Sequence, residues 1–345
     1  MKKVFLFSLI AVFVFHSCKK NEEIQEPEFA KREGTAIIIT GAAARIAQEV
    51  ALLEELYVQG KMKDVKFISG VSSGSLNTVF LNAILNNKFS FERFKPILFS
   101  LKNDSVFIKS QTDLPVSTAP LKKLLTRVIN DTLKFKKISD LPVPSAISVV
   151  DFAFLSPGQR TYRLSNKAIN DEYDSQIDMI ELLMASTAYP FIFAPGRFTD
   201  PKTMPNSSYI DGASFDDYVP YAAAIEYEKL VDMGFDTLII VSRKGSSKAK
   251  LSEELTQLGI VDLTVFDANN LSLDNLTDEG FEKGLRRLQE VAPVLAERTY
   301  VYVPDFDSNF LVFDFNNMET QYETTKTWAQ THKPILLKDY LAKKK

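Results

Sequence analysis

Apolar residues occur along this chain in two alternating patterns, short continuous runs and longer stretches with helical spacing. Residues 35–40 read TAIIIT, a β-branched run typical of a strand that is buried on both faces. Residues 42–57 then repeat apolar side chains at the spacing of one helical face. A second short strand is expected at 65–68 and a second helix at 76–84. This order predicts a β-α-β-α unit, which builds a parallel sheet.

The same two patterns continue to the end of the chain. Strands are expected at 146–154, 207–210, 236–241 and 298–303, and helices near 179–188, 222–233, 280–298 and 319–329. Residues 86–140 are rich in Phe with interspersed lysines and show no clear strand pattern. We expect them to form helices and loops that pack against the sheet, with a lid over an apolar pocket as the alternative. The chain therefore predicts the α/β class with a mostly parallel sheet.

The first 34 residues differ from the rest in composition. Lys2 and Lys3 precede a 12-residue apolar run at 4–15, which has the form of a secretion signal and is too short to cross a bilayer. Cys18 follows, the only cysteine of the chain. This arrangement resembles the lipobox of bacterial lipoproteins, in which the cysteine becomes a lipidated N-terminus. The alternative is an ordinary signal peptide with an incidental cysteine.

From these features we expect a lipoprotein signal peptide at 1–17, a flexible charged tether at 18–34 and a single domain at 35–345. The protein would be exported and attached to the membrane through Cys18, in the cell envelope and at its outer membrane. The formal net charge of −3 argues against a nucleic-acid partner. The sequence contains no His/Cys cluster and no phosphate-binding loop, so we expect no metal and no other cofactor.

Candidate chemistry first arises at residues 70–74, which read Gly-Val-Ser-Ser-Gly between the second expected strand and the second expected helix. A strand, a sharp turn flanked by glycines and a helix together form a nucleophile elbow. Gly70 and Gly74 permit a turn too tight for a Cβ atom, and the Ser72 hydroxyl would project over the end of the sheet. The helix N-terminus behind it would stabilise a developing oxyanion. The alternative is a Gly/Ser loop that only joins two elements.

A serine nucleophile needs a base, and two candidates remain in the mature chain. Asp211 ends a short apolar strand and precedes Gly212 and Ala213, which would place its carboxylate at an edge of the sheet. An Asx turn that closes the strand explains the same pattern. His332 lies in a polar segment 13 residues from the end, whereas His16 belongs to the signal. We favour Asp211, and a Ser-Asp-His triad with His332 is the alternative.

Several blocks, taken in order, resemble the patatin-like phospholipase family. They are GVSSGSLNT at 70–78, STAPLKKLLTRVI at 117–129, MASTAYPFIFAP at 184–195 and DGASFDDYVP at 211–220. The resemblance implies a three-layer α/β/α sandwich and a lipid acyl hydrolase in which Ser72 is the nucleophile and Asp211 the general base. The Gly212-Ala213 pair corresponds to the family's Asp-Gly-Gly/Ala motif.

The resemblance also implies an oxyanion hole formed by Gly41, Ala42 and Ala43, with Arg45 beside it. The family's loop reads Asp-Gly-Gly-Gly-x-Arg/Lys-Gly, whereas two glycines are Ala42 and Ala43 here and the last is Ile46. An alanine keeps its N–H but loses free access to positive φ, at a cost of about 1 kcal/mol. The expected function is hydrolysis of acyl esters of lipids, and a weakly active or inactive lipid-binding protein of the same fold is the alternative.

Overall fold

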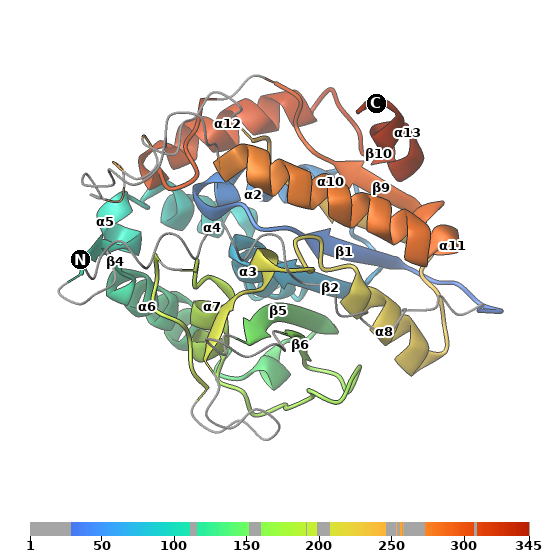
Figure 1. Cartoon of the computed structure of the whole chain (residues 1–345), viewed down its shortest axis with the longest axis horizontal. Coiled ribbons are helices and arrows are strands. Elements are labelled where there is room, and N and C mark those ends of the chain that lie inside the picture. The colour runs from blue at the N-terminus through green and yellow to red at the C-terminus, as the bar shows by residue number, and fades with distance from the viewer. Residues whose placement is uncertain are drawn as a thin grey trace, which may run out of the picture.

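A mixed sheet with mostly parallel strands lies between two layers of helices (Figure 1). The computed structural model describes residues 29–110, 116–151, 160–190, 192–198, 208–245, 273–306 and 309–344, together with residues 253, 256 and 258. The sheet and its two helical layers confirm the expected α/β fold. The expected signal peptide, Cys18 and most of the expected tether lie outside the described residues.

The main sheet has eight strands in the order β10-β9-β8-β1-β2-β5-β6, and β7 pairs with β5. The central strands β9, β8, β1, β2 and β5 run parallel, whereas β10, β6 and β7 are antiparallel to their partners. Their bounds are β1 (Thr35–Ile39), β2 (Val65–Val71), β5 (Ser145–Asp151), β6 (Thr161–Ser165), β7 (Tyr209–Asp211), β8 (Thr237–Val241), β9 (Thr299–Tyr302) and β10 (Ile335–Leu336).

Each face of the sheet has its own apolar core, because successive side chains of a strand point to opposite faces. In β1, Ile37 and Ile39 pack into the core on one face, whereas Ala36 and Ile38 pack into the core on the other. The first core includes α2 (Ile46–Val58), which follows the 3-10 turn η1 (Ala43–Arg45), and also α3 (Ser73–Leu85), α7 (Met179–Ser186) and α12 (Met318–Ala329). The second includes α8 (Ala222–Val231), α10 (Leu273–Val291), α11 (Pro293–Ala296) and α13 (Leu337–Ala342).

Strand β5 brings the ends of β2 and β7 together. One edge of β5 pairs with β6, and on the other edge β2 pairs as far as Ser148 while β7 takes over at Val149. Because β7 runs antiparallel to β5, its last residue, Asp211, meets the end of β2, where Ser72 follows. The expected position of Asp211 at the sheet edge is thus reached through an antiparallel strand and not through another parallel one.

Residues 86–140 form a compact group of short elements beside the first core. They are α4 (Phe91–Phe99), α5 (Asn103–Val106), a two-stranded sheet of β3 (Ile108–Lys109) and β4 (Val116–Ser117), α6 (Ala119–Leu125), its π-helical continuation η2 (Thr126–Leu133) and η3 (Ile138–Asp140). Their buried Phe and Leu side chains belong to the first core. The expected packing of helices and loops is observed, and the same elements also line the cavity described below.

The sequence did not predict the β3–β4 pair, β10 or α13, and the structure differs from the sequence expectations at three further places. The helix expected at 280–298 is divided between α10 and α11, because Pro293 has no N–H to continue α10. Strand β6 was not expected, since its TYRLS run has a weak apolar pattern and lies at the edge of the sheet. Residues assigned to the tether also pair with the domain: Arg32 forms a β-bridge with Gly234, and the Gly34 N–H donates to Asp236 Oδ2 over 3.0 Å. Folded structure therefore begins before Thr35.

Among the described helices, none combines the length and the apolar character that crossing a bilayer requires.

Candidate active site

Ser72 lies in the sharp turn between β2 and α3, with φ 55° and ψ −130°. A positive φ is uncommon for a residue with a Cβ atom, and such backbone strain clusters at functional sites. The two flanking glycines are required by close packing. A Cβ at Gly70 would lie 2.3 Å from the Gly74 carbonyl oxygen, and a Cβ at Gly74 would lie 2.3 Å from the Thr40 carbonyl oxygen. The turn therefore has the geometry of a nucleophile elbow.

The side chains of Ser72 and Asp211 line the same cavity, and the Ser72 hydroxyl is close enough to lower the pKa of the Asp211 carboxyl. Asp211 is only 3% exposed, and its Oδ1 also accepts the Ala213 N–H over 2.9 Å. Burial raises the pKa of Asp211 to about 7, and the Ser72 hydroxyl and the Ala213 N–H only partly oppose that rise. The structure thus places a carboxyl group that titrates near neutrality against a serine hydroxyl.

The 184–195 block holds both partners in place. The Ser186 hydroxyl accepts the Ser72 N–H over 3.0 Å and donates to the Ser148 carbonyl over 2.9 Å. The Asp211 N–H donates to the Ala188 carbonyl over 3.0 Å. We identified this block only by its resemblance, and Ser186 and Ala188 have no signal of their own in a single sequence. Their contacts explain physically why the block accompanies Ser72 and Asp211.

The turn at residues 41–45 lies directly beside Ser72. A Cβ at Gly41 would be 3.0 Å from Ser72 Cβ and 3.6 Å from Ser72 Oγ, so a larger residue there would crowd the Ser72 side chain. Ala43 has φ 46°, and the hydrogen bonds described for this part of the chain include no acceptor for its N–H. The Ala42 N–H, in contrast, donates to Ser73 Oγ over 2.8 Å, and Ala42 has φ −136°. The Ala42 N–H, which we expected to help hold the oxyanion, is thus already bound to the side chain of Ser73, and the oxyanion hole stays a prediction.

Arg45 is buried and supports this turn from behind. Its Nε donates to the Phe310 carbonyl over 3.1 Å, and its Nη2 donates to the same oxygen. The Ala44 N–H donates to the Val312 carbonyl over 2.8 Å, and Gln321 Nε2 donates to the Ala44 carbonyl over 3.2 Å. The turn is thus fastened to the C-terminal part of the chain.

A buried carboxyl group that the sequence did not single out lies under the same turn. Glu49 of α2 accepts hydrogen bonds from Asn77 Nδ2 at 3.0 Å and from Thr40 Oγ1 at 3.4 Å. Burial raises the pKa of Glu49 well above its ordinary value, although the charge of Arg243 and both hydrogen bonds act in the opposite direction. Glu49 therefore links the start of the turn to the helix that follows Ser72.

A cavity opens at Ser72 and Asp211, with an empty volume of about 870 Å³ that includes the solvent at its mouth. Apart from Ser72, Ser73, Thr187, Tyr189 and Asp211, its described lining residues are apolar. They come from α3, from residues 86–140 and from the segment before α12, and include Phe80, Phe94, Leu121, Leu125, Phe313 and Phe315. Such a surface fits a hydrocarbon chain.

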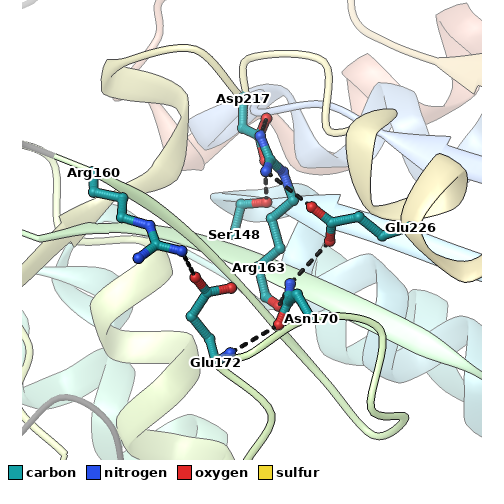
Figure 2. Close-up of polar contacts among 7 residues, drawn as sticks. All are labelled: Ser148, Arg160, Arg163, Asn170, Glu172, Asp217 and Glu226. Carbon is teal, nitrogen blue, oxygen red and sulfur yellow. Dashed lines mark hydrogen bonds and ion pairs between the residues drawn. The ribbon is translucent and has the colours of Figure 1, made fainter. Parts of the chain in front are cut away.

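Behind Asp211, a network of ion pairs and hydrogen bonds fixes the loop that follows it (Figure 2). Arg163 of β6 binds Asp217 with two hydrogen bonds of 2.8 and 2.9 Å, and Ser148 Oγ donates to the same carboxylate over 2.7 Å. Burial alone would lower the pKa of Arg163, but the charges of Asp217 and Glu226 outweigh it and keep the guanidinium ionised. Since Ser148 also accepts the hydrogen bond of Ser186, this network and the Ser72 turn share a residue.

The structure does not bring His332 to Ser72. His332 is exposed beyond the end of α12, where its ring stacks on Trp328 at 4.3 Å and its Nδ1 is 2.8 Å from the Trp328 carbonyl oxygen. It is not among the residues that line the cavity. Neither His16 nor Cys18 lies in the described part of the chain.

Comparisons with known proteins give one clear result. A family model described as Patatin-like phospholipase matches residues 37–225. The chain is also similar to the crystal structure of VipD from Legionella pneumophila, at 10% identity and a TM-score of 0.38, over 93% of this chain and 73% of that chain. A comparison with curated proteins gives no match.

Proposed function

Because the chain belongs to the patatin-like phospholipase family, we propose that it hydrolyses acyl esters of lipids with Ser72 as nucleophile and Asp211 as general base. The observation that carries this proposal is that the Ser72 side chain, at a strained elbow, and the buried Asp211 carboxyl lie together at one apolar cavity. A nucleophile and a base within hydrogen-bond reach are what acyl transfer requires.

In the proposed reaction, Ser72 Oγ attacks the ester carbonyl carbon while the Asp211 carboxylate accepts its proton. The carbonyl oxygen becomes an oxyanion, and the proposed donors for it are the Gly41 and Ala43 N–H groups and the N-terminus of α3. Asp211 then returns the proton to the leaving alcohol, and an acyl-Ser72 ester remains. A water molecule, deprotonated by Asp211, attacks this ester and releases the fatty acid and the free Ser72 hydroxyl.

The cavity indicates which part of the substrate enters. Among the described residues that line it, Asp211 is the only one with a charged side chain, so a charged head group would lose its hydration there without a partner. We therefore propose that the acyl chain enters the cavity and that the alcohol part stays at its mouth.

A second candidate is a lipid-binding protein with little or no activity. The hydrogen bond from the Ala42 N–H to Ser73 Oγ favours it, because one of the expected oxyanion donors is already occupied. Loss of one such donor lowers the rate by about 10²- to 10³-fold.

A fluorophosphonate probe combined with ester hydrolysis separates the two candidates. For the hydrolase, we expect labelling of Ser72 in the wild type, none in Ser72→Ala, and a rate lower by about four orders of magnitude in Ser72→Ala and Asp211→Asn. The double variant should be no worse than either single one, because nucleophile and base act as a unit. Ser139→Ala is the matched control, because Ser139 is exposed on η3 and does not line the cavity, and its rate should stay within about threefold of the wild type. A folded wild type that is neither labelled nor active would identify the binding protein.

We also propose that the protein is exported and attached to the cell envelope, at its outer membrane, through a lipid on Cys18. The short apolar run before Cys18 supports this. Mass spectrometry of the mature protein should find a lipidated Cys18 at its N-terminus, and an unmodified N-terminus at another residue would exclude it.

A further inference from the structure

The basic residues of this chain are concentrated in the elements that cover the cavity. Residues 86–140, here called the cap segment, contain eleven Lys or Arg and five Asp or Glu. The remaining residues contain 30 Lys or Arg and 39 Asp or Glu. The cap segment is thus strongly cationic on a chain that is acidic elsewhere.

The cap segment separates its apolar and basic side chains. On α6 and η2, Leu121, Leu125 and Val128 line the cavity, whereas Lys122, Lys123 and Arg127 are exposed. The other exposed cations of the segment are Lys88, Arg93, Lys102, Lys109, Lys134, Lys136 and Lys137. The cavity therefore lies under a wall whose outer surface is basic.

These charges are not neutralised by acidic neighbours. Within the described residues, Lys95 is the only cation of the cap segment that forms an ion pair, with Glu54 of α2. Lys102 and Lys137 contact neutral oxygens, the Asn316 carbonyl and the Gln176 side chain. An apolar side chain, Ile108, is 46% exposed on the β3–β4 pair beside Lys109. Unpaired cations around an exposed apolar group are typical of surfaces that bind anionic bilayers.

We propose that the outer surface of the cap segment docks this protein on a bilayer that contains anionic phospholipids. The cations attract the lipid head groups, and the acidic remainder of the molecule is repelled by them, so the cap segment faces the membrane. That the cavity then receives its substrate from the bilayer rests on the proposed function, whereas the docking does not.

The test measures co-sedimentation of the full chain with vesicles, in a Ser72→Ala background so that the lipid is not consumed. One set of vesicles is phosphatidylcholine alone, which carries no net charge. In the other set about one-third of the lipid is phosphatidylglycerol, which is anionic. The test variant is Lys122→Glu/Lys123→Glu/Arg127→Glu. The control variant, Lys229→Glu/Lys338→Glu/Lys343→Glu, changes the net charge equally at exposed positions on α8 and around α13, on the opposite side of the molecule from α6 (Figure 1). Thermal unfolding shows whether each variant is folded. If the charge-reversal variant is not folded, Lys122→Gln/Lys123→Gln/Arg127→Gln replaces it.

Each cation near an anionic surface contributes about fivefold to binding, so the loss of three cations should reduce the preference for anionic vesicles by about 100-fold, and the three added carboxylates should reduce it further. The control variant should stay within about threefold of the parent, and the preference should weaken at 0.5 M salt, where the Debye length is only about 4 Å. The N-terminal segment is common to all variants, so its contribution cancels when the variants are compared.

The proposal is overturned if the parent shows no preference for anionic vesicles or if the control variant loses as much as the test variant. It is also overturned if the parent binds no vesicles but self-associates at low salt, which would assign the cap segment to the acidic surface of a second copy. An active enzyme with no anionic preference would contradict the docking alone, and an inactive protein that keeps it would contradict the proposed function alone.

Discussion

At the scale of single residues, the buried carboxyl group of Asp211 leads to a pH prediction. Burial raises its pKa to about 7, and in the proposed reaction only the ionised form accepts the proton of Ser72. We therefore expect kcat/KM for a soluble ester to fall about tenfold per pH unit below pH 7 and to be level above it. A pH series of initial rates checks this, and a rate that does not change between pH 5 and 8 would contradict Asp211 as the base.

The Asp211 carboxyl group should also make stability depend on pH, in the direction opposite to activity. Its pKa in the folded protein is higher than its ordinary value of 3.8, so the folded state binds the proton more tightly than the unfolded state. The free energy of unfolding therefore decreases as the pH rises from about 4 to about 7. In Asp211→Asn this contribution is absent, and chemical denaturation should show that the variant gains stability relative to the wild type as the pH increases.

Ala43 and Ala42 provide a matched pair for testing backbone strain. Ala43 has φ 46°, in the left-handed region, whereas Ala42 has φ −136°, which any residue adopts. We expect Ala43→Gly to stabilise the protein by about 1 kcal/mol and Ala42→Gly to destabilise it slightly, because a glycine adds flexibility without relieving strain. Denaturant midpoints measure both changes. Equal effects of the two substitutions would show that φ at Ala43 stores no strain.

If the Ala43 N–H holds the oxyanion, Ala43→Gly should also preserve or raise the hydrolysis rate. A rate reduced by a factor of 10² or more would instead indicate that the methyl group helps to position the turn.

At the scale of elements, the pair formed by β6 and the loop after β7 depends on Arg163. The Asp217 carboxylate is buried, the Arg163 guanidinium is partly buried, and the two bind each other with two hydrogen bonds (Figure 2). Arg163→Met leaves the carboxylate buried without its partner, and we expect a loss of about 3–5 kcal/mol in the free energy of unfolding. Arg287→Met is the control, because the pair of Arg287 with Glu290 is exposed on α10 and contributes less than about 0.5 kcal/mol. Similar losses in both variants would contradict this role for the buried pair.

Sequence patterns predicted those elements whose burial follows from their own residues. The TAIIIT run became β1, and the apolar run before Gly70 became β2, because both strands are covered on two faces. The strand–turn–helix context around Ser72 was also readable for this reason. Strand β6 has three half-buried residues at the edge of the sheet, so its pattern is weak.

The surroundings of the site could not be predicted in the same way. Ser186, Ala188, Glu49 and Arg163 are separated from their partners by long stretches of chain, and their importance arises only from contacts. The direction of β7 could not be predicted either, since a three-residue strand contains no signal for parallel or antiparallel pairing. The occupied N–H of Ala42 likewise depends on a side chain 31 positions away.

At the scale of the whole molecule, the part matched by the family model does not contain all of the fold. The match ends at residue 225, within α8, whereas β8 pairs with β1 along its full length and α12 packs on α2. The Arg45 side chain and the Ala44 N–H are bound by carbonyl groups of Phe310 and Val312. The residues after 225 thus complete both the centre of the sheet and the turn beside Ser72.

We therefore expect a chain shortened to residues 29–225 to lack a cooperative unfolding transition, in contrast to residues 29–345. Its exposed β1 edge would present unpaired N–H and C=O groups, and both cores would lose one side of their packing, which favours aggregation over folding. Circular dichroism during heating and size-exclusion chromatography measure the two outcomes. Adding residues 226–345 as a separate chain is the informative control, because restored probe labelling of Ser72 would show that the second part supplies missing contacts. A shortened chain that unfolds cooperatively and is still labelled at Ser72 would show instead that β8 and the Phe310 segment are dispensable for the site.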